Sequence, residues 1–220
     1  DNGSTDGTME WLKDFQAVCR QAGVEITLLE NKTNVGCSTA RNQGAASARG
    51  KFIVFMDNDV AIRSRSWLNT LSDRLTADSG TGIVGPKLVY PFEPYRIQCA
   101  GAAVSPSGRI QFLGRGAVRE EADFNRERET QCLISACWMM RRDLFEKSGG
   151  FDEAFNPVEF EDIDLCYRIR SQGYRTLYMP NVEMYHFEST TTAGTPALRN
   201  TYLIIKHGLL FKKRWRAMFE

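Results

Sequence analysis

The 220-residue sequence predicts a single-domain α/β fold in which helices flank a doubly wound, mostly parallel sheet. Helical and strand periodicity alternate through the first half of the chain, and this alternation is the main indication of the fold class. The run 51–56 is apolar after its first residue, which is typical of a strand covered on both faces. Because we find no internal repeat and no linker, we expect one domain.

The first half begins with an amphipathic helix over 7–22. Trp11, Phe15 and Val18 fall on one face of this helix, and Gly23 ends the helical pattern. Apolar spacing and helix-ending glycines assign the next elements in the same way. They are a strand over 25–30, a helix over 38–48, a strand over 51–56, a helix over 66–77 and a strand that starts at 82.

The second half contains shorter β-like pieces and more turn residues. Its charged stretch 119–129 is predicted to be a mobile loop, and we consider it a candidate lid. The remaining predictions are strands over 97–104 and 109–113, an apolar segment over 133–140, helices over 142–148 and 163–172, strands over 175–179 and 182–187, and an amphipathic helix over 197–219.

The composition excludes several classes of protein. Lys plus Arg (28) nearly balances Asp plus Glu (27), so the chain lacks the basic footprint of a nucleic-acid-binding protein. Six scattered cysteines are expected to be reduced and mostly buried. Because the sequence has only two histidines, a Cys/His zinc site is not expected. The sequence contains no run of 18 apolar residues, so it predicts no membrane-spanning helix. The first residues, Asp-Asn-Gly-Ser, suggest that the chain begins inside a domain.

Two carboxylates, those of Asp57 and Asp59, follow the apolar strand directly. In a doubly wound sheet, ligands gather at the carboxyl ends of the strands, so both side chains are expected to face an open crevice. Carboxylate oxygens suit Mg²⁺ or Mn²⁺, which in turn hold phosphate oxygens. The alternative for this tripeptide is an ordinary turn, because Asp and Asn favour turns for their own hydrogen bonds.

Two further polar segments precede predicted helices. Residues 1–8 form a Gly-containing turn before a helix N-terminus, where free N–H groups and the helix dipole favour anions. Residues 34–36 open the next helix, which carries Arg41. The structural alternatives are helix capping for the first segment and a solvated helix arginine for the second.

Five motifs in order resemble the family-two inverting glycosyltransferases of the GT-A fold, with bacterial rhamnosyltransferase-like enzymes as the most similar group. The motifs lie at 1–8, 34–42, 55–59, 149–155 and 159–168, and the resemblance covers about residues 1–190. It implies a Rossmann-like sheet with a small antiparallel acceptor-side part. The nucleotide-binding half would be 1–90, the acceptor-side half 91–190 and the C-terminal helix 191–220. In the family a first strand precedes Asp-Asn-Gly-Ser, and here it is absent.

The resemblance also implies roles for single residues. The implied nucleotide contacts are Asp1, Asn2, Arg41, Asp57 and Asn58, and the implied ligands of a Mg²⁺ or Mn²⁺ cofactor are Asp59, Asp57 and His186. For His186 the alternative is a strand histidine satisfied by its neighbours.

A second acidic group lies at the start of the helix predicted over 163–172. Glu161 and Asp162 are crowded by other carboxylates, and such crowding or burial raises a pKa towards the working range of a general base. The resemblance assigns the base to this pair, and we prefer Asp162. Helix capping is the structural alternative. Asp164 is expected to pair with Arg168 one helical turn later.

The acceptor side is predicted less sharply. Trp138 and Phe160 could contact an acceptor sugar, or both could belong to the core. The basic, aromatic tail 206–220 could lie on an anionic membrane, or it could be a solvated basic face over an apolar stripe.

Together these observations predict transfer of a sugar from a UDP- or dTDP-linked donor to a hydroxyl of a glycan or lipid-linked glycan. The expected location is cytoplasmic, with peripheral contact at the inner face of the cytoplasmic membrane as one option. Two other functions stay open: a non-catalytic nucleotide- or glycan-binding module of the same fold, and a nucleotidyltransferase, which would also use paired carboxylates and a metal.

Overall fold

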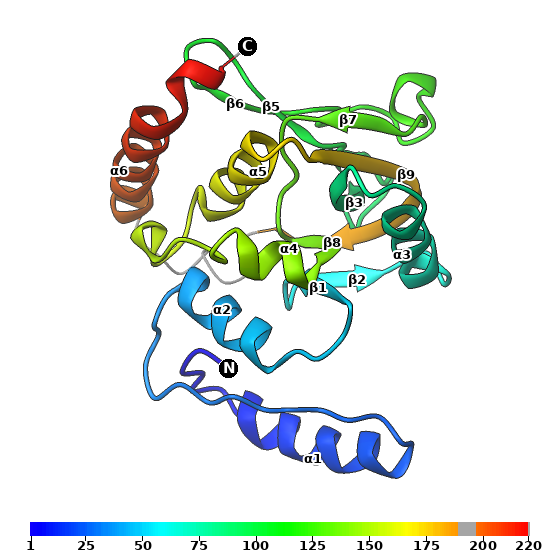
Figure 1. The fold of residues 1–220 in the computed structure, drawn as a ribbon. Helices are drawn as coiled ribbons and strands as arrows, with labels where there is room; N and C mark the ends of the chain where they lie inside the picture. Colours follow the sequence, from blue (N-terminus) through cyan, green and yellow to red (C-terminus); the bar gives the residue numbers. More distant parts are fainter. Residues whose placement is uncertain (189–196, 220) are drawn as a thin grey trace.

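The computed structural model describes residues 1–188 and 197–219, and it confirms an α/β fold in which helices flank a seven-stranded sheet (Figure 1). The helices are α1 (Thr8–Gln21), α2 (Cys37–Ser47), α3 (Trp67–Ala77), α4 (Arg142–Lys147), α5 (Glu161–Ser171) and α6 (Ala197–Trp215). The strands are β1 (Phe52–Met56), β2 (Val60–Ile62), β3 (Thr81–Val89), β4 (Ile97–Cys99), β5 (Ala102–Val104), β6 (Ile110–Phe112), β7 (Arg128–Thr130), β8 (Cys137–Arg141) and β9 (Arg175–His186). Three short 3₁₀ helices are η1 (Ala122–Phe124), η2 (Glu153–Phe155) and η3 (Arg216–Met218).

The main sheet is mixed and follows the order β1-β8-β3-β9-β2. β3 and β9 pair in parallel, whereas β8 is antiparallel to both of its neighbours and β2 is antiparallel to β9. β1, β3 and β9 therefore run in one direction, but of these three strands only β3 and β9 are neighbours. Because β2, β4, β7 and β8 run the other way, the described sheet is mixed and its parallel part is smaller than predicted. β5 and β6 form a separate antiparallel hairpin.

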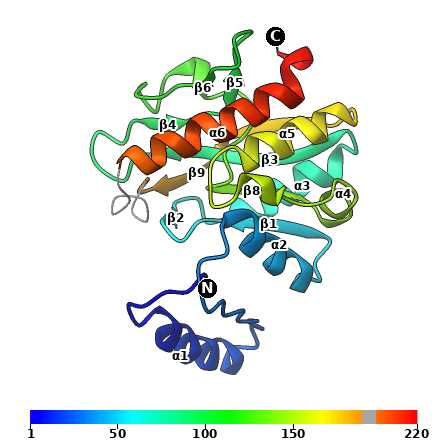
Figure 2. The ribbon, with the colours of Figure 1, turned by 90° about the vertical axis from the view of Figure 1, so that its left-hand side faces the viewer.

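The two faces of the sheet bury separate apolar clusters. Adjacent residues of a strand point to opposite faces, so Ile83 of β3 joins one cluster and Val84 joins the other. α3 packs on the Val84 face through Leu71 and Leu75, whereas α4, α5 and α6 cover the Ile83 face (Figures 1 and 2). All six cysteines are free and four of them are buried, as expected.

β9 is one strand of twelve residues, although the sequence predicted two strands separated at Pro180. Its pairing with β3 passes from Pro86↔Met179 to Lys87↔Glu183, so residues 180–182 have no partner in β3. The irregularity accommodates Pro180, which cannot donate a backbone hydrogen bond. The strand continues beyond it and carries His186 at its end.

The predicted strand over 25–30 is wrong: this segment forms no strand in the structure. Its backbone contacts are with Asp1, whose N-terminal amine donates to the carbonyl oxygen of Leu29 (2.7 Å) and whose carbonyl oxygen accepts from Asn31 (3.0 Å). A strand needs a continuous ladder of such bonds, and one neighbouring residue does not supply it.

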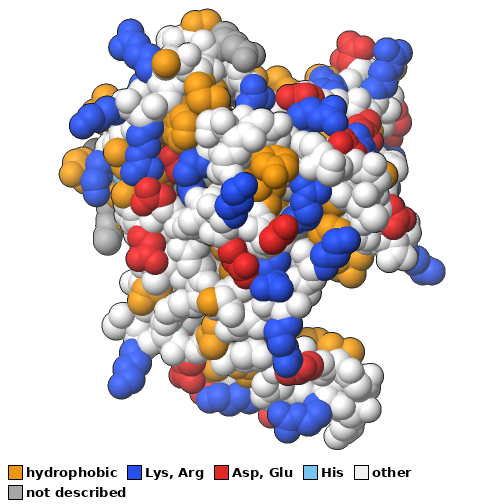
Figure 3. All heavy atoms as spheres, viewed as in Figure 1, with side chains coloured by type: hydrophobic (Ala, Val, Ile, Leu, Met, Phe, Trp, Pro, Cys, Tyr) orange, Lys and Arg blue, Asp and Glu red, His pale blue; other side chains and the backbone are white. Residues whose placement is uncertain are grey.

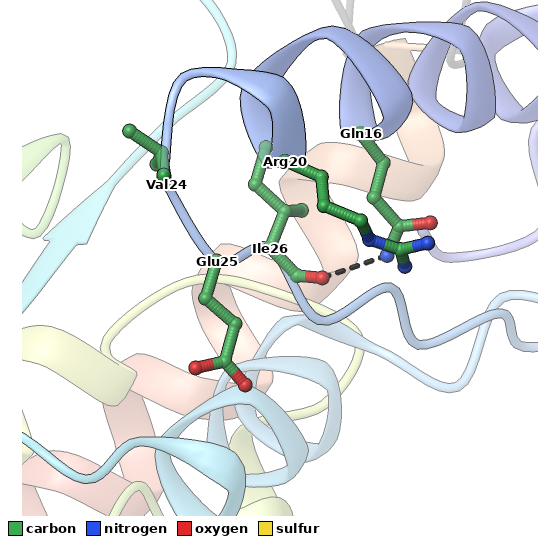
Figure 4. Close-up of a pocket in the computed structure, with 6 residues that line it drawn as sticks. Gln16, Arg20, Val24, Glu25 and Ile26 are labelled. Carbon is green, nitrogen blue, oxygen red and sulfur yellow. Dashed lines mark hydrogen bonds between the residues drawn. The ribbon is translucent and has the colours of Figure 1, made fainter.

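α1 forms as predicted, but its apolar face is exposed. Trp11 and Phe15 stack on each other with ring centroids 5.1 Å apart and remain 61% and 43% exposed. Figures 1 and 2 show α1 lying apart from the sheet. Where α1 ends, the side-chain amide of Gln16 donates to the carbonyl oxygen of Ile26 (2.7 Å) at a shallow pocket (Figure 4). The apolar face predicted for this helix is therefore exposed within the described residues.

The segment 119–129 is attached to the sheet, which contradicts its assignment as a mobile lid. The ammonium of Lys87 donates to the side chain of Asn125 (2.6 Å) and to the carbonyl oxygen of Arg119 (3.2 Å). The segment then enters β7, which pairs with β9 through Arg128 opposite Tyr178. A buried lysine and a strand ladder hold this segment in place, and the sequence pattern of charges did not reveal either contact.

Candidate active site

A tight turn after β1 carries two carboxylates, those of Asp57 and Asp59, to the end of β9. The backbone N–H of Val60 donates to the carbonyl oxygen of Asp57 (3.3 Å), and the N–H of Phe187 donates to that of Asp59 (3.0 Å). β2 follows at once and pairs Val60 with His186. The turn considered as an alternative to metal binding is therefore present, and it brings both carboxylates to His186.

Asp57, Asp59 and His186 form a group that fits a divalent cation. One potential ligand atom from each of the three lies within 4.8 Å of the others. The Nε2 atom of His186 is 3.3 Å from Oδ1 of Asp59. Carboxylate oxygens suit Mg²⁺ and Mn²⁺, and imidazole nitrogen suits transition metals. The three residues that the resemblance implied as ligands thus come together in the fold.

Gln98 of β4 orients His186 through the ring nitrogen that does not face Asp59. Its side-chain oxygen lies 2.6 Å from Nδ1 of His186, and its amide nitrogen donates to the backbone oxygen of the same histidine (3.2 Å). An amide oxygen accepts and does not donate, so Nδ1 carries a proton and Nε2 is the ring nitrogen that faces Asp59. Nε2 is therefore the atom that this contact leaves available to a metal.

Gln98→Leu is expected to weaken Mn²⁺ binding by about 10–100-fold, because loss of an outer partner frees the orientation and tautomer of a ligating histidine. Isothermal titration with Mn²⁺ alone measures the effect. Gln98→Glu should retain tight binding, since a carboxylate also accepts from Nδ1. Gln111→Leu, at an exposed position of β6, is the matched control. Equal Mn²⁺ affinity in Gln98→Leu and the wild type would contradict the assignment.

Arg41 lies between the two acidic groups. Its side chain projects from α2 and is 15% exposed. One terminal nitrogen pairs with Oδ1 of Asp57 (2.5 Å), while the other lies 3.4 Å from Oε1 of Glu161 and donates to the hydroxyl of Ser135. The alternative of a solvated helix arginine does not apply. One guanidinium joins the acid after β1 to the acid that begins α5.

Asp162 and Glu161 occupy the first turn of α5 with different exposures. Asp162 is partly exposed, and its carboxylate accepts from the backbone N–H groups of Ser135 (3.0 Å) and Ile163 (2.7 Å). Glu161 is 4% exposed, and its Oε2 atom has no hydrogen-bond partner in the described part of the chain. Glu161 is thus placed to balance the charge of Arg41, whereas Asp162 is the more accessible carboxylate.

Burial raises the pKa of both acids. For Glu161, burial is the largest cause, the charge of Asp162 adds to it and Arg41 opposes it, and the resulting pKa is about 7. For Asp162, burial raises the pKa against the hydrogen bond from Ser135 and the charge of Arg41. Carboxylates with raised pKa values in a cleft are suited to accept a proton near neutral pH.

Glu161→Gln is expected to change how stability depends on pH. The folded protein holds the Glu161 proton up to about pH 7, whereas the unfolded chain releases it near 4.5, so the wild type loses stability as pH rises through this window. The free energy of unfolding of the variant relative to the wild type should therefore rise by on the order of 1–3 kcal/mol between these pH values. Urea unfolding across the pH range measures this, with the exposed Glu153→Gln as control. A constant difference would contradict the raised pKa.

The backbone before α5 is strained. Glu159 and Phe160 have φ angles of 85° and 74°, values that residues other than glycine rarely adopt. Such conformations cost about 1–3 kcal/mol each and cluster at functional sites. Here two consecutive strained residues set the position of Glu161 and Asp162.

Residues 1–149 of the chain match the family described as "Glycosyl transferase family 2". The chain belongs to glycosyl transferase family 2. Two relatives support the assignment. The chain is 32% identical over 155 residues to the O-antigen biosynthesis protein RfbC of Myxococcus xanthus, covering 68% of this chain and 12% of that protein. It is 28% identical over 226 residues to the N-acetylglucosaminyl-diphospho-decaprenol L-rhamnosyltransferase of Mycobacterium tuberculosis, covering 90% of this chain and 68% of that protein.

The fold of this family member is GT-A. The crystal structure of GalNAc-T7 with UDP, GalNAc and Mn²⁺ is similar, with a TM-score of 0.68 and 17% identity over 83% of this chain and 36% of that one. At this identity the likeness concerns the fold alone. The chain thus spans about an eighth of the length of RfbC and about a third of that of the GalNAc-T7 structure.

The side chains of the first two residues make contacts within and between the first two motifs. The carboxylate of Asp1 accepts from the N–H of Gly3 (2.9 Å), and the side chain of Asn2 accepts from the N–H of Val35 (3.0 Å). The contact of Asp1 lies within one turn, whereas that of Asn2 joins residues 1–8 to residues 34–36. Asn58 is exposed at the tip of its turn. Contact of these side chains with a nucleotide stays a prediction.

The two aromatic candidates for acceptor contact differ. Trp138 is fully buried and stacks on Phe151 with ring centroids 6.1 Å apart, so its assignment to the acceptor site is corrected to the core. Phe160 is partly exposed and packs against Phe211 of α6 (5.6 Å between ring centroids). Phe160 therefore lies at the junction of α5 and α6, and its contact with an acceptor sugar stays a prediction.

Asp164 is structural, as predicted. It accepts from Arg168 (2.8 Å) and also from the indole of Trp215 (2.8 Å) and the guanidinium of Arg214 (3.2 Å). The last two contacts attach the end of α6 to α5. Part of the basic tail is therefore used inside the fold.

Two site residues, Gln98 and Ser135, were missed by the sequence analysis. Each is a single polar residue within an otherwise apolar run, in 97–99 and 133–140 respectively. A polar residue buried in an apolar run needs a hydrogen-bond partner, and this was the available signal.

Proposed function

We propose that this glycosyltransferase transfers a sugar from a UDP- or dTDP-linked donor to a hydroxyl of a glycan or lipid-linked glycan, with inversion at the anomeric carbon and with a divalent cation as cofactor. The observation that carries the proposal is the position of Arg41. It contacts both Asp57 and Glu161, so the group that fits a metal and the group that fits a base lie next to each other. Sugar transfer requires the donor and the acceptor to be held next to each other.

The donor side is proposed to use the residues named by the resemblance. Asp57, Asp59 and His186 would hold Mn²⁺ or Mg²⁺, which when bound supplies positive charge near the departing diphosphate. The guanidinium of Arg41 adds a fixed positive charge beside this group. The proposed nucleotide contacts are Asp1, Asn2, Arg41, Asp57 and Asn58.

Asp162 is proposed to act as general base. The acceptor oxygen forms a bond to the anomeric carbon, the bond from that carbon to the diphosphate oxygen breaks, and the electron pair leaves with the nucleoside diphosphate. The acceptor proton passes to the carboxylate of Asp162, which the N–H of Ser135 holds in place. Glu161 balances the charge of Arg41, and this ion pair joins α2 to α5.

Product analysis tests the proposed function. Incubation with Mn²⁺, UDP- or dTDP-sugars and a panel of glycan and lipid-linked acceptors should yield a nucleoside diphosphate and an inverted glycoside, and EDTA should abolish both products. Release of pyrophosphate from a nucleoside triphosphate would favour a nucleotidyltransferase instead. Donor binding in calorimetry without any product from the panel would favour a binding module.

We also propose peripheral contact with the inner face of the cytoplasmic membrane through residues 206–220. Among the described residues, no helix is long and apolar enough to cross a bilayer. On α6 and η3, Lys206, Lys213 and Arg216 are exposed, and Leu209 beside them is 64% exposed. Exposed basic and apolar side chains on one helix favour an anionic bilayer surface.

Vesicle sedimentation measures this contact. Binding to vesicles that contain 30% anionic lipid is expected to fall about 5- to 30-fold when Lys206, Lys213 and Arg216 are replaced by glutamine, since each cation contributes about 1 kcal/mol near such a surface at most. Replacing Lys13, Arg20 and Lys32 with glutamine removes the same charge from the region of α1 and is the matched control. Equal binding by both triple variants would refute the contact.

A further inference from the structure

A groove of about 440 Å³ lies between α6, the turn of the β5–β6 hairpin and the strained segment before α5. Its size falls in the range of small-molecule sites, roughly 300–1,000 Å³. Figures 1 and 2 show α6 lying beside α5, with the hairpin near its C-terminal end. Glu159 and Phe160 line the groove and directly precede Glu161 and Asp162 in the chain, so the wall of the groove adjoins the segment that carries both acids.

One side of the groove is apolar and open. Ile205 and Leu209, one helical turn apart on α6, line it and are 57% and 64% exposed. Gly208 lets α6 approach Phe160 closely, because an added Cβ at this position would lie 3.3 Å from the phenyl ring. Exposed aliphatic side chains along a concave surface gain free energy when a hydrocarbon covers them.

The other feature of the groove is positive charge. Arg109 and Lys212 line it, and neither has an acidic partner within residues 1–188 and 197–219. The acid in the lining is Glu159, whose pKa is raised by burial and by the charge of Asp162. Figure 3 shows basic and apolar side chains mixed along the left side of the molecule, where α6 lies. Two unpaired cations beside an apolar surface complement an amphipathic anion.

We propose that this groove binds the lipid phosphate of a lipid-linked acceptor, with the hydrocarbon chain against Ile205 and Leu209 and the phosphate on Arg109 and Lys212. The inference rests on the proposed function, because it assigns a site to the acceptor of that reaction. A concave groove with cations in its wall fits a single lipid chain with its headgroup. It would place the acceptor beside Phe160, immediately before the carboxylate of Asp162.

Calorimetric titration of the full chain with farnesyl phosphate, kept below its aggregation concentration, tests the groove. We expect saturable one-to-one binding that is roughly tenfold or more weaker for geranyl phosphate, which is five carbons shorter, because each buried CH₂ changes affinity about fourfold. Inorganic phosphate can contact only the two cations, and farnesol can contact only the apolar wall. Each should therefore bind roughly tenfold or more weakly than farnesyl phosphate. Equal affinity of inorganic phosphate and farnesyl phosphate would assign the site to free phosphate and overturn the proposal.

Surface variants locate the site. Leu209→Glu, and separately Arg109→Gln combined with Lys212→Gln, should each weaken farnesyl phosphate binding roughly tenfold or more. Val18→Glu and Lys13→Gln on α1, where the side chains are 62% and 59% exposed, are the matched controls and should bind as the wild type does. Thermal unfolding confirms that each variant is folded. Unchanged binding in both groove variants would overturn the proposal.

Two outcomes separate this inference from the function on which it rests. Sugar transfer by a chain that does not bind farnesyl phosphate would reject the groove and retain the function. Groove-dependent binding by a chain that releases no nucleoside diphosphate from any donor would retain the groove and reject the function. Binding to vesicles of phosphatidylcholine and phosphatidylglycerol, lost in the groove variants, without binding of monomeric farnesyl phosphate would replace the groove by a membrane surface.

Discussion

Asp162→Asn is expected to lower the rate of sugar transfer by about 10²–10⁴-fold while donor affinity stays close to that of the wild type. The amide cannot take the proton of the acceptor hydroxyl, but its oxygen can still accept the hydrogen bond from the N–H of Ser135. The site should therefore keep its shape and lose a base. Steady-state rates and donor titrations, measured side by side, separate these two effects.

The pH dependence of the rate provides a second measurement of the same role. Because burial raises the pKa of Asp162, the wild-type rate should increase with pH as this carboxyl loses its proton, and the variant should lack that increase. Asp73→Asn, at an exposed position of α3, is the matched control and should behave as the wild type. If Asp162→Asn transferred sugar at the wild-type rate, the assignment of the base would be wrong.

Arg41→Met is expected to lower the free energy of unfolding by about 3–5 kcal/mol, the usual cost of removing one partner from a buried ion pair. Without the guanidinium, Glu161 is left buried beside Asp162 without a compensating charge, and the hydroxyl of Ser135 loses a donor. Chemical unfolding at a pH well above 7, where the carboxyl of Glu161 is ionised beside Arg41, measures the loss. At lower pH the loss should be smaller, because Glu161 then takes up a proton and no longer needs a cation.

Two variants keep this prediction specific. Arg49→Met removes an arginine that follows α2 and is 74% exposed, and exposed ion pairs of this kind contribute little. Arg41→Lys keeps the charge but cannot contact Asp57 and Glu161 with a planar fork, so it should be intermediate. Equal stability of Arg41→Met and Arg49→Met would show that Arg41 does not join the two acidic groups.

Local patterns predicted the elements that carry the site. The helix over 66–77 is α3, the strand over 51–56 is β1, and the carboxylates of Asp57 and Asp59 do follow that strand. These signals act over a few residues: apolar spacing, a glycine that ends a helix, and polar residues at the end of an apolar run. The same local signals identified the apolar face of α1, but periodicity does not say what covers a face, and this one is exposed.

The residues that failed prediction depend on distant partners. The segment 119–129 looked mobile from its charge, yet Lys87 and β9 hold it, and Trp138 looked available yet is enclosed by Phe151 and its neighbours. A buried lysine and a ring stack join residues that the sequence keeps apart. Their positions follow from packing, which a linear pattern does not encode.

The sequence by itself determined the helices, strand β1 and the kinds of side chain at their ends, because these follow from interactions between residues a few positions apart. Only the tertiary structure decided that Arg41 meets Ser135 and Glu161, which lie 94 and 120 residues away, and that Gln98 orients His186 across 88 residues. Contacts over such separations exist only after the sheet has assembled, since the backbone must first bring the ends of β1, β4 and β9 to one edge.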